Sequence, residues 1–375
     1  SDESVVEQWS ENNYYQYFCG EYVFQPCEPC EASELVHFRN RIGESGIELI
    51  LKESIRINGN DSNDSTASID TTVQEKNITF PTDSKLHRKI IDKCRKIAEK
   101  ENLPVRQSYT RTLKRLSLDQ RFRNHPRNKW KAGKADRKEK TIAGRLVREL
   151  ERNLSPDSRY QSDIDLFKRI LNQKKSDSHK IYSVHEPDVQ CISKGKEHKK
   201  YEFGNKVSII YTQTTGVIIG AMGFRNPYDG HTIEPALEQT ERLLGKRTIK
   251  TLIGDRGYKG KRQINDTTIE IPKPFSNRKQ SQYQQNKLKK QFRRRVAIEP
   301  INGHLKTDHH LNHNFYKGIT GDNINVMLAA AAFNFKRMMN KWKSSFWLNF
   351  KIKIVDLIDS MLHQINNEII LKWAF

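Results

Sequence analysis

The sequence has few cysteines, and they do not form a disulfide framework. Five cysteines occur in 375 residues, an odd number with irregular spacing. This excludes the small secreted proteins that disulfides hold together, and it favours a reducing compartment. Cys27 and Cys30 form one CxxC pair. Because no second pair lies nearby, a zinc site here would need distant ligands.

Long apolar segments are lacking as well. The longest, Met327–Phe333, is far shorter than the roughly 20 residues that an α-helix needs to cross a bilayer. No signal peptide is visible, although the chain begins at Ser1 and we expect its start to be incomplete. The sequence therefore favours a cytoplasmic protein with no membrane partner.

Acidic residues are scarce relative to basic ones. The chain has 45 Asp and Glu against 66 Lys and Arg, which gives a formal net charge of +21 and a pI of about 9.6. Such an excess is far beyond what solubility requires and indicates a polyanionic partner, most simply nucleic acid. A lysine-rich soluble protein of another kind, such as a ribosomal protein, is the alternative interpretation of the charge. The hydrophobic content of 35% is sufficient for a buried core.

The charge is unevenly distributed along the chain. Residues 1–60 hold 4 basic and 11 acidic residues, whereas residues 81–160 hold 24 and 10, and residues 271–320 hold 11 and 2. Short apolar segments in the first region, separated by glycines and prolines, predict a small helical bundle with a supporting role. The second region has apolar residues at every fourth position from Ile142 to Leu154, which predicts a basic helical insertion.

Three aromatic residues of this insertion allow two interpretations. They are Tyr109, Phe122 and Trp130. Such side chains can stack on unpaired bases, but aromatic residues more often pack in the core of their own domain, and we expect the second role.

The first strand of an α/β core follows the N-terminal region. Apolar residues alternate from Ala67 to Val73, a pattern that predicts a strand containing Asp70. Further strands are predicted at residues 181–184, 206–212 and 217–224, of which the last two form a hairpin.

A helix and another strand complete this core. Residues 229–244 predict a helix that ends at Gly245, and residues 249–253 predict a strand that Gly254 and Asp255 follow. A strand, a helix and a strand that ends in a carboxylate are typical of an α/β domain. A short strand at residues 268–271, a largely helical region at 282–311 with Ser281 as its N-cap, and an Ala-rich helix at 324–339 that packs on the sheet are also predicted.

The predicted domain organisation follows from these elements. We expect a helical N-terminal region at residues 1–60, a catalytic domain at 61–343 with a helical insertion at about 82–178, and a C-terminal helical tail at 344–375. One apolar stripe in the tail suits docking on the core or on a second protomer equally well.

Two aspartates and one helix are the candidates for chemistry. Asp70 lies within its predicted strand and Asp255 at the end of a later one, and the two could meet if those strands are neighbours, because ligand sites of such sheets collect at strand ends. An isolated carboxylate at a strand end is more often a turn former or a helix cap. On the predicted helix, Arg295, Glu299, Asn302 and Lys306 share one face. One carboxylate among cations suits a metal ligand flanked by phosphate-binding groups, but an ordinary Arg–Glu ion pair on a solvated face is the alternative.

Other residues near this helix give weaker indications. Pro300 lacks an amide proton and should kink or restart the helix. The histidines around it have no spacing typical of a zinc site, so we expect them to contact phosphate or to cap the helix. Asp229 and His231 can lie near the site, although a turn followed by a helix start explains them as well.

Five segments of the sequence resemble bacterial insertion-sequence transposases, in particular the broad fifth insertion-sequence family. In chain order they are DTTVQEKNITFPTDSKLHRKII (70–91), IYSVHEPDVQCISKGKEHKKYEFGNKV (181–207), NPYDGHTIEPAL (226–237), IGDRGYKG (253–260) and RRVAIEPINGHLKTDH (294–309). The resemblance covers roughly residues 1–343. In the last segment, the family motif of an aromatic residue, Arg, Glu and Lys corresponds to Phe292, Arg295, Glu299 and Lys306, with Phe where Tyr is usual. The family's first several tens of residues are missing, and the tail after about residue 344 departs from the family.

The resemblance implies a fold, a reaction and a set of residues. The fold is ribonuclease-H-like, a mixed sheet flanked by helices. Asp70, Asp255 and Glu299 form a catalytic Asp-Asp-Glu triad that binds two Mg²⁺ or Mn²⁺ ions per site, consistent with the preference of these ions for oxygen ligands. The residues expected to bind DNA are Arg295, Lys306, Asn302, His304, Arg256 and Lys259.

The expected activity is cleavage at the 3′ ends of an insertion sequence and transfer of those ends to target DNA. The partners would be duplex DNA, as terminal inverted repeats and as target, and a second copy of the chain in a nucleoid-associated homodimer. Two alternatives remain open. One is a metal-dependent nuclease that hydrolyses DNA without joining it, and the other is a truncated, inactive remnant that binds DNA or represses the element.

Overall fold

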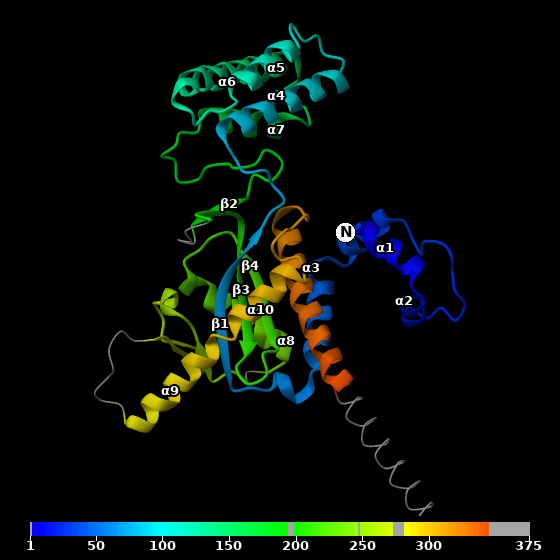
Figure 1. Cartoon of the computed structure of the whole chain (residues 1–375), viewed down its shortest axis with the longest axis vertical. Coiled ribbons are helices and arrows are strands. Elements are labelled where there is room, and N and C mark those ends of the chain that lie inside the picture. Colours follow the sequence, from blue (N-terminus) through cyan, green and yellow to red (C-terminus); the bar gives the residue numbers. More distant parts are fainter. Residues whose placement is uncertain (1, 194–198, 247, 273–280, 345–375) are drawn as a thin grey trace, which may run out of the picture. The chain divides into compact units, whose positions relative to one another are not determined.

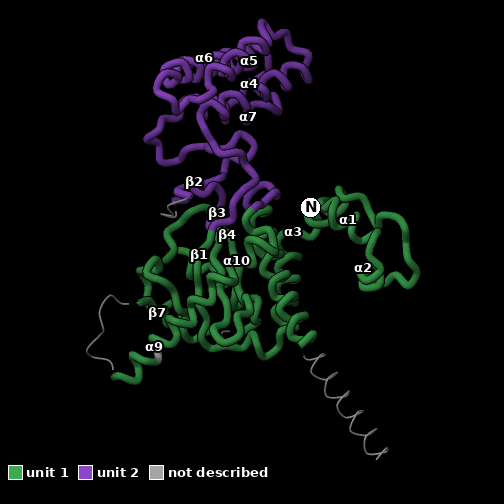
Figure 2. The backbone as a smooth tube through the Cα atoms, in the orientation of Figure 1, with its two compact units in different colours: residues 1–72, 207–312, 320–375 green, residues 73–206, 313–319 purple. Residues whose placement is uncertain are grey.

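The computed structural model describes residues 2–193, 199–246, 248–272 and 281–344 (Figure 1). It divides into two compact units (Figure 2). Unit 1 comprises residues 1–72, 207–312 and 320–375, and unit 2 comprises residues 73–206 and 313–319. The predicted C-terminal tail, apart from Ser344, lies outside the described residues. Among the described helices, none combines the length and the apolar character that crossing a bilayer would require.

The N-terminal region of unit 1 is helical. It contains α1 (Asp2–Glu11), α2 (Asn13–Phe18) and α3 (Ala32–Arg56), followed by a short 3₁₀ turn at Gly59–Ser62. Gly43 has φ 61° inside α3 and divides it into two helices that meet at a kink. Glycine adopts this left-handed conformation without steric cost, so the predicted break at this residue is confirmed.

A mixed sheet forms the centre of the fold. Its strands, within the described residues, are β1 (Thr66–Glu75), β2 (Gln190–Ser193), β3 (Tyr201–Thr212), β4 (Ile218–Phe224), β5 (Thr251–Ile253), β6 (Gln263–Ile264) and β7 (Thr267–Glu270). The order is β2-β3-β1-β5-β7-β6, with β4 paired to β3. Helices flank this sheet (Figure 1). The predicted class, an α/β fold with a mixed sheet flanked by helices, is confirmed and is compatible with a ribonuclease-H-like domain.

The predicted hairpin is also confirmed. β3 and β4 are joined by a tight turn in which Gly216 has φ 73° and donates its N–H to the carbonyl of Thr212. The strand predicted at residues 181–184 is wrong, because this segment is irregular and the strand lies at Gln190–Ser193 instead. Ile181 and Val184 are apolar because they are buried against the helices of unit 2.

Helices of unit 1 pack on β4. α8 (Ile233–Leu244) ends at Gly245, whose φ of 69° gives the left-handed C-cap that the sequence predicts. The helical residues 318–344 also contact this strand, because the side chain of Asn334 bonds both the N–H and the carbonyl of Ile218 at 3.0 and 2.8 Å. This confirms that the predicted Ala-rich helix packs on the sheet.

Unit 2 contains the predicted basic helical insertion. Its helices are α4 (Asp83–Lys100), α5 (Thr110–Asp119), α6 (Pro126–Asn153) and α7 (Gln161–Asn172). They share a buried apolar cluster to which α6 contributes Ile142, Leu146 and Leu150, the face predicted from the four-residue spacing. Of the three aromatic residues expected in this core, only Tyr109 packs against it. Phe122 and Trp130 are 79% and 70% exposed, so the expectation is wrong for both.

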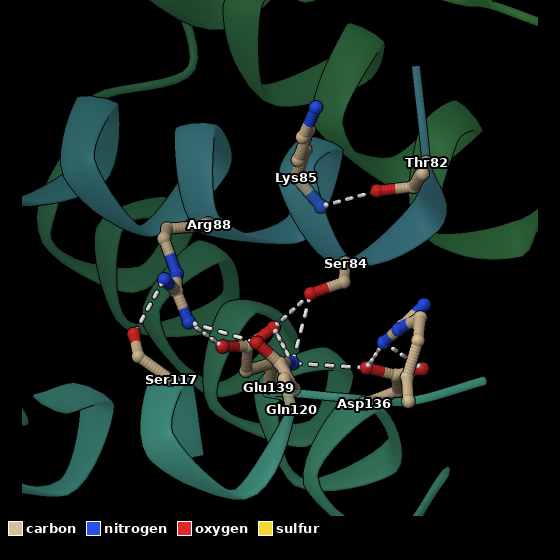
Figure 3. A network of polar contacts seen from close by, with 9 residues as sticks. Thr82, Ser84, Lys85, Arg88, Ser117, Gln120, Asp136 and Glu139 are labelled. Carbon is tan, nitrogen blue, oxygen red and sulfur yellow. Dashed lines mark hydrogen bonds and ion pairs between the residues drawn. The ribbon is translucent and has the colours of Figure 1, made fainter. Parts of the chain in front are cut away.

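A polar network lies within this helical cluster (Figure 3). The carboxylate of Glu139, on α6, is fully buried and accepts hydrogen bonds from Arg88, Ser84 and Gln120. A buried carboxylate is costly unless it is paired and hydrogen-bonded, and here three donors satisfy it. The network therefore holds α4, α5 and α6 in one arrangement.

Candidate active site

Asp70 lies in the middle of β1, and Asp255 lies two residues beyond the end of the neighbouring strand β5. β1 and β5 are parallel, and Ser68 pairs with Ile253. Asp70 and Asp255 each lie two residues beyond this pair, on the same side of their strands by the two-residue period. Parallel strands place such residues at the same edge of the sheet. The sheet register therefore brings together two residues that are 185 positions apart in the sequence.

A third carboxylate lies beside Asp255. Asp255 precedes the 3₁₀ turn Arg256–Tyr258 and accepts a hydrogen bond from the N–H of Gly257 at 2.7 Å. A Cβ atom at Gly257 would lie 2.9 Å from Asp255 Oδ1 and 2.9 Å from Asp229 Oδ2, so both carboxylates converge on this glycine. Asp229 also accepts a hydrogen bond from Thr71 Oγ1 at 3.1 Å. Asp229 thus lies beside Asp255. The sequence had left two interpretations of Asp229 open, a position near the site and an ordinary turn before a helix.

The ring of Tyr258 lies among these carboxylates. This side chain is 1% exposed. Burial, and to a smaller extent the carboxylates of Asp70, Asp229 and Asp255, hold the pKa of the Tyr258 phenol well above its usual value. Tyr258 stays neutral beside them and adds no further negative charge.

Two helices carry Arg295, Glu299, Asn302 and Lys306, the residues that share one face of the helix predicted from the sequence. α9 (Gln282–Arg295) begins with a capping box formed by Ser281 and Gln284, which confirms Ser281 as its N-cap. The chain restarts as α10 (Ile298–Thr307), with Pro300 in its first turn. Proline is tolerated there because the amide protons of a first turn have no partner within the helix. The predicted restart at this proline is confirmed.

Both helices contact Asp70. Arg295 Nη1 lies 3.5 Å from Asp70 Oδ1, and Asn302 Nδ2 donates to Asp70 Oδ2 at 3.1 Å. The carbonyl of Arg295 accepts a hydrogen bond from Tyr211, on β3, at 2.9 Å, and burial raises the pKa of that phenol to about 12. This bond fixes the end of α9 on the sheet. Glu299 lies in the chain between Arg295 and Asn302, and its side chain is exposed with no hydrogen bond or ion pair to any described residue.

The other predicted DNA-binding residues lie in different surroundings. His304 bonds Asp308 at 3.0 Å and packs near Phe333, in a separate pocket of 670 Å³ between α10 and the helical residues 318–344. Arg256 and Lys259 line a pocket of 500 Å³ together with Tyr258 and residues 268–270 of β7. Lys306 is half-buried near the end of α10. The structure therefore brings Arg295 and Asn302 to Asp70, whereas His304 turns to a different partner.

The donor chemistry fits a divalent cation, with one rearrangement. Carboxylate oxygens are the ligands that Mg²⁺ and Mn²⁺ prefer. Among the described residues, no three His, Cys, Asp or Glu side chains are close enough to hold a metal ion as they stand. Asp70 is instead engaged with Arg295 and Asn302, which a cation would have to replace.

Comparison with known proteins identifies part of this chain. Residues 176–335 match the family model described as "Transposase DDE domain". A relative from Rhizobium meliloti, "Uncharacterized protein ORF8 in nfe locus", is 42% identical over 132 residues, which is 34% of this chain and 64% of the relative. The chain thus spans less than two thirds of that protein's length. No solved structure matches. The matched family segment includes Asp255 and Glu299, whereas Asp70 precedes it.

Proposed function

We propose that this chain, which contains a transposase DDE domain, cleaves the 3′ ends of an insertion sequence and joins them to target DNA. The observation that carries the proposal is the register of the parallel strands β1 and β5, in which Asp70 and Asp255 each follow the pair Ser68–Ile253 by two residues. Arg295 of α9 and Asn302 of α10 both contact Asp70. These contacts hold α10, which carries Glu299, beside Asp70. Membership of the fifth insertion-sequence family belongs to this proposal.

Asp70, Asp255 and Glu299 would hold the divalent ions, with Asp229 beside them. Two such ions, when bound, activate the attacking oxygen and stabilise the leaving oxygen of a phosphodiester. For Asp70 to act as a ligand, Arg295 and Asn302 must release it. The exposed carboxylate of Glu299 is available for the same purpose, since no described residue engages it.

The groups that surround the carboxylates would position the DNA. The Arg295 guanidinium, once released from Asp70, can form two parallel hydrogen bonds with a phosphate. Lys306, Asn302 and His304 on α10, with Arg256 and Lys259 next to Asp255, would hold further phosphates of the terminal repeats and the target. A homodimer that pairs two ends, at the nucleoid, is part of the proposal.

The test is cleavage and joining of a labelled duplex that carries the element's terminal repeat, with Mg²⁺ or Mn²⁺. Glu299→Gln removes the charge of one proposed ligand, so joined products should disappear. Glu238→Gln, on the exposed face of α8, makes the same substitution away from the site and should retain them. Products that persist in Glu299→Gln would refute its role as a ligand.

One observation favours the second candidate, a DNA-binding remnant that does not catalyse. The described residues contain no assembled group of three metal-binding side chains. Salt-sensitive DNA binding without cleavage by the unmodified chain, in either metal, would support the remnant and overturn the proposed activity. Cleavage without joining would instead identify a nuclease.

A further inference from the structure

A groove runs between α6 and α7 of unit 2. It has a volume of 790 Å³. Arg137, Lys140, Thr141, Gly144, Val147, Arg148 and Glu151 of α6 and Lys168, Leu171 and Asn172 of α7 line it. Four of these ten side chains are basic and one is acidic. The groove is therefore a cationic surface, and its lining includes the partly buried side chain of Leu171 and the buried Val147.

The acidic residues of α6 do not neutralise this surface. The helix contains ten Lys and Arg and four Asp and Glu. Glu139 is buried with Arg88, and Asp136 pairs with Arg123 at 2.7 Å (Figure 3). Glu149 accepts the N–H of Arg106, and Glu151 pairs with Lys168. Glu151 thus offsets only Lys168 within the groove, and none of the four carboxylates pairs with Arg137, Lys140 or Arg148.

Three cations of the groove remain uncompensated. The side chains of Arg137, Lys140 and Arg148 are exposed, and no described residue forms an ion pair or a side-chain hydrogen bond with them. They lie 3 and 11 residues apart from the first, and 11 residues of helix span about 16 Å. A DNA strand presents several phosphates over such a length, because successive phosphates are about 3.4 Å apart along the axis. The row therefore matches the charge and the dimension of a phosphate backbone.

The floor of the groove contains a glycine in the middle of a long helix. Gly144 lies in the interior of a helix of 28 residues, where glycine lowers helix stability relative to alanine. A Cβ atom at this position would meet only the tip of Arg148, at 3.3 Å. Packing within the protein thus does not require glycine. The missing side chain lets an external backbone approach the helix closely, between Arg137 and Arg148.

We propose that this groove binds the sugar-phosphate backbone of duplex DNA. Arg137, Lys140 and Arg148 would contact phosphates, Asn172 would donate a hydrogen bond, and a deoxyribose would lie over Gly144 beside Leu171. Backbone contacts of this kind fix the position of the duplex and do not select its sequence. The inference rests on the proposed function only for the source of the DNA.

The first test compares two pairs of substitutions in the full chain. Lys140→Gln with Arg148→Gln removes two groove cations, and Lys114→Gln with Arg115→Gln removes two exposed cations of α5. Affinity for a fluorescein-labelled duplex is measured by anisotropy at several salt concentrations without divalent metal. The groove variant should bind about tenfold more weakly, and its slope of log affinity against log salt should fall by roughly 1.8, for two lost phosphate contacts. An equal loss in both variants would overturn the proposal, because net charge alone would then explain it.

A second test leaves the charge unchanged. Gly144→Leu fills the floor of the groove with a good helix former, and Gly133→Leu makes the same change on α6, where a Cβ would meet no atom within 4 Å. Far-ultraviolet circular dichroism checks that both variants are folded. Gly144→Leu should weaken binding severalfold and Gly133→Leu should not. Unchanged binding by Gly144→Leu would refute the close approach of the backbone.

These measurements separate the groove from the proposed chemistry. Because binding is measured without metal, it needs no cleavage. Wild-type chain that joins DNA ends but binds independently of the groove would refute the groove alone. Groove-dependent binding by a chain that never cleaves would support the groove and refute the transposase activity. A second copy of the chain in the groove would appear as a concentration-dependent mass in solution that the groove variant abolishes, and this too would overturn the proposal.

Discussion

At the scale of single residues, the positions of the Asp255 and Asp229 carboxylates depend on a glycine. Gly257 donates its N–H to Asp255 and leaves room for both Asp255 and Asp229. A side chain of any size at this position would push at least one carboxylate away. The geometry of the group is thus determined by a residue that has no functional group of its own.

Gly257→Ala should therefore impair the site without unfolding the protein. Its Cβ would lie 2.9 Å from oxygen atoms of two carboxylates, closer than real Cβ contacts, so the carboxylates must move. We expect a loss of metal-dependent cleavage of about 100-fold, as for other small displacements of catalytic groups. Gly303→Ala, where no atom lies within 4 Å, is the control and should stabilise α10 by about 0.5–1 kcal/mol. Cleavage by Gly257→Ala at the wild-type rate would contradict this account.

The sequence predicted some of these residues and not others, for physical reasons. The positions of Asp70 within a strand and of Asp255 after a strand could be predicted from the alternation of apolar residues and from the end of an apolar segment. Asp229 lies in a turn before a helix, and a turn alone does not show which way its carboxylate points. The partner of His304 is Asp308, four residues later on the same helix, so its direction follows from a local pair that the motif did not indicate.

At the scale of elements, long periodic segments were predictable and short irregular ones were not. α6, α8 and the β3–β4 hairpin follow from apolar period, caps and turn glycines. The segment at residues 181–184 has the composition of a strand, but Ile181 and Val184 are apolar because they cover the helical cluster. The apolar residues of a short segment show that the segment is buried. They do not show whether it is buried as a strand or as a loop.

The pairing of β1 and β3 within unit 2 makes Gly204→Ala strongly destabilising. A Cβ atom at Gly204 would lie 1.9 Å from the carbonyl oxygen of Gln74, a backbone atom that cannot swing aside. We expect a loss of about 3 kcal/mol in the free energy of unfolding, measured by denaturant titration. A loss below about 0.5 kcal/mol would mean that the two strands lie farther apart at this point.

α4 gives unit 2 a dependence on pH. His87 is buried, its Nδ1 has no hydrogen-bond partner among the described residues, and burial lowers its pKa below 6.5 despite the opposing charges of Asp83, Glu139 and Asp136. Lys140 lowers it further. The unfolded chain therefore binds a proton more tightly than the folded chain does, so stability is complete above about pH 6.5 and declines as the pH falls through the folded pKa.

Thermal denaturation of the wild type and of His87→Gln tests this dependence. Between pH 7 and pH 5 the wild type should lose more stability than the variant, because the variant has no imidazole to protonate. Parallel curves for the two proteins would show that His87 contributes nothing to the acid response.

At the scale of the whole molecule, the two units have separate buried cores. The cluster of unit 2 consists of residues from α4 to α7 and the segment that follows them. Unit 1 has its own buried residues. They come from β5, from α8 and from the part of β1 that precedes residue 73. The sequence predicted a helical insertion from charge and period, but it could not show that the insertion extends to residue 206, because β1 and β3 each contain residues of both units.

Separate cores predict separate local stabilities. Glu139→Ala leaves Arg88, Ser84 and Gln120 without their buried acceptor, which should cost unit 2 about 3–5 kcal/mol. Hydrogen exchange followed by mass spectrometry should then show faster exchange in α4–α7 and unchanged protection in β5 and α8. Equal loss of protection in both units would show that they unfold as one.

The interruption of the sheet by residues 73–206 also orders events during synthesis. β1 emerges from the ribosome first, yet its partners β3 and β5 follow only after the whole helical segment. At roughly 5–20 residues per second, translation of that segment takes on the order of ten seconds. The helices thus have time to fold on the nascent chain after Asp70 has been synthesised and before Asp255 and Glu299 have been. A polypeptide whose synthesis stops after α7 and before Asp255 would contain the groove that we propose to bind DNA but not the proposed triad, so by this proposal it would occupy DNA that it cannot cut.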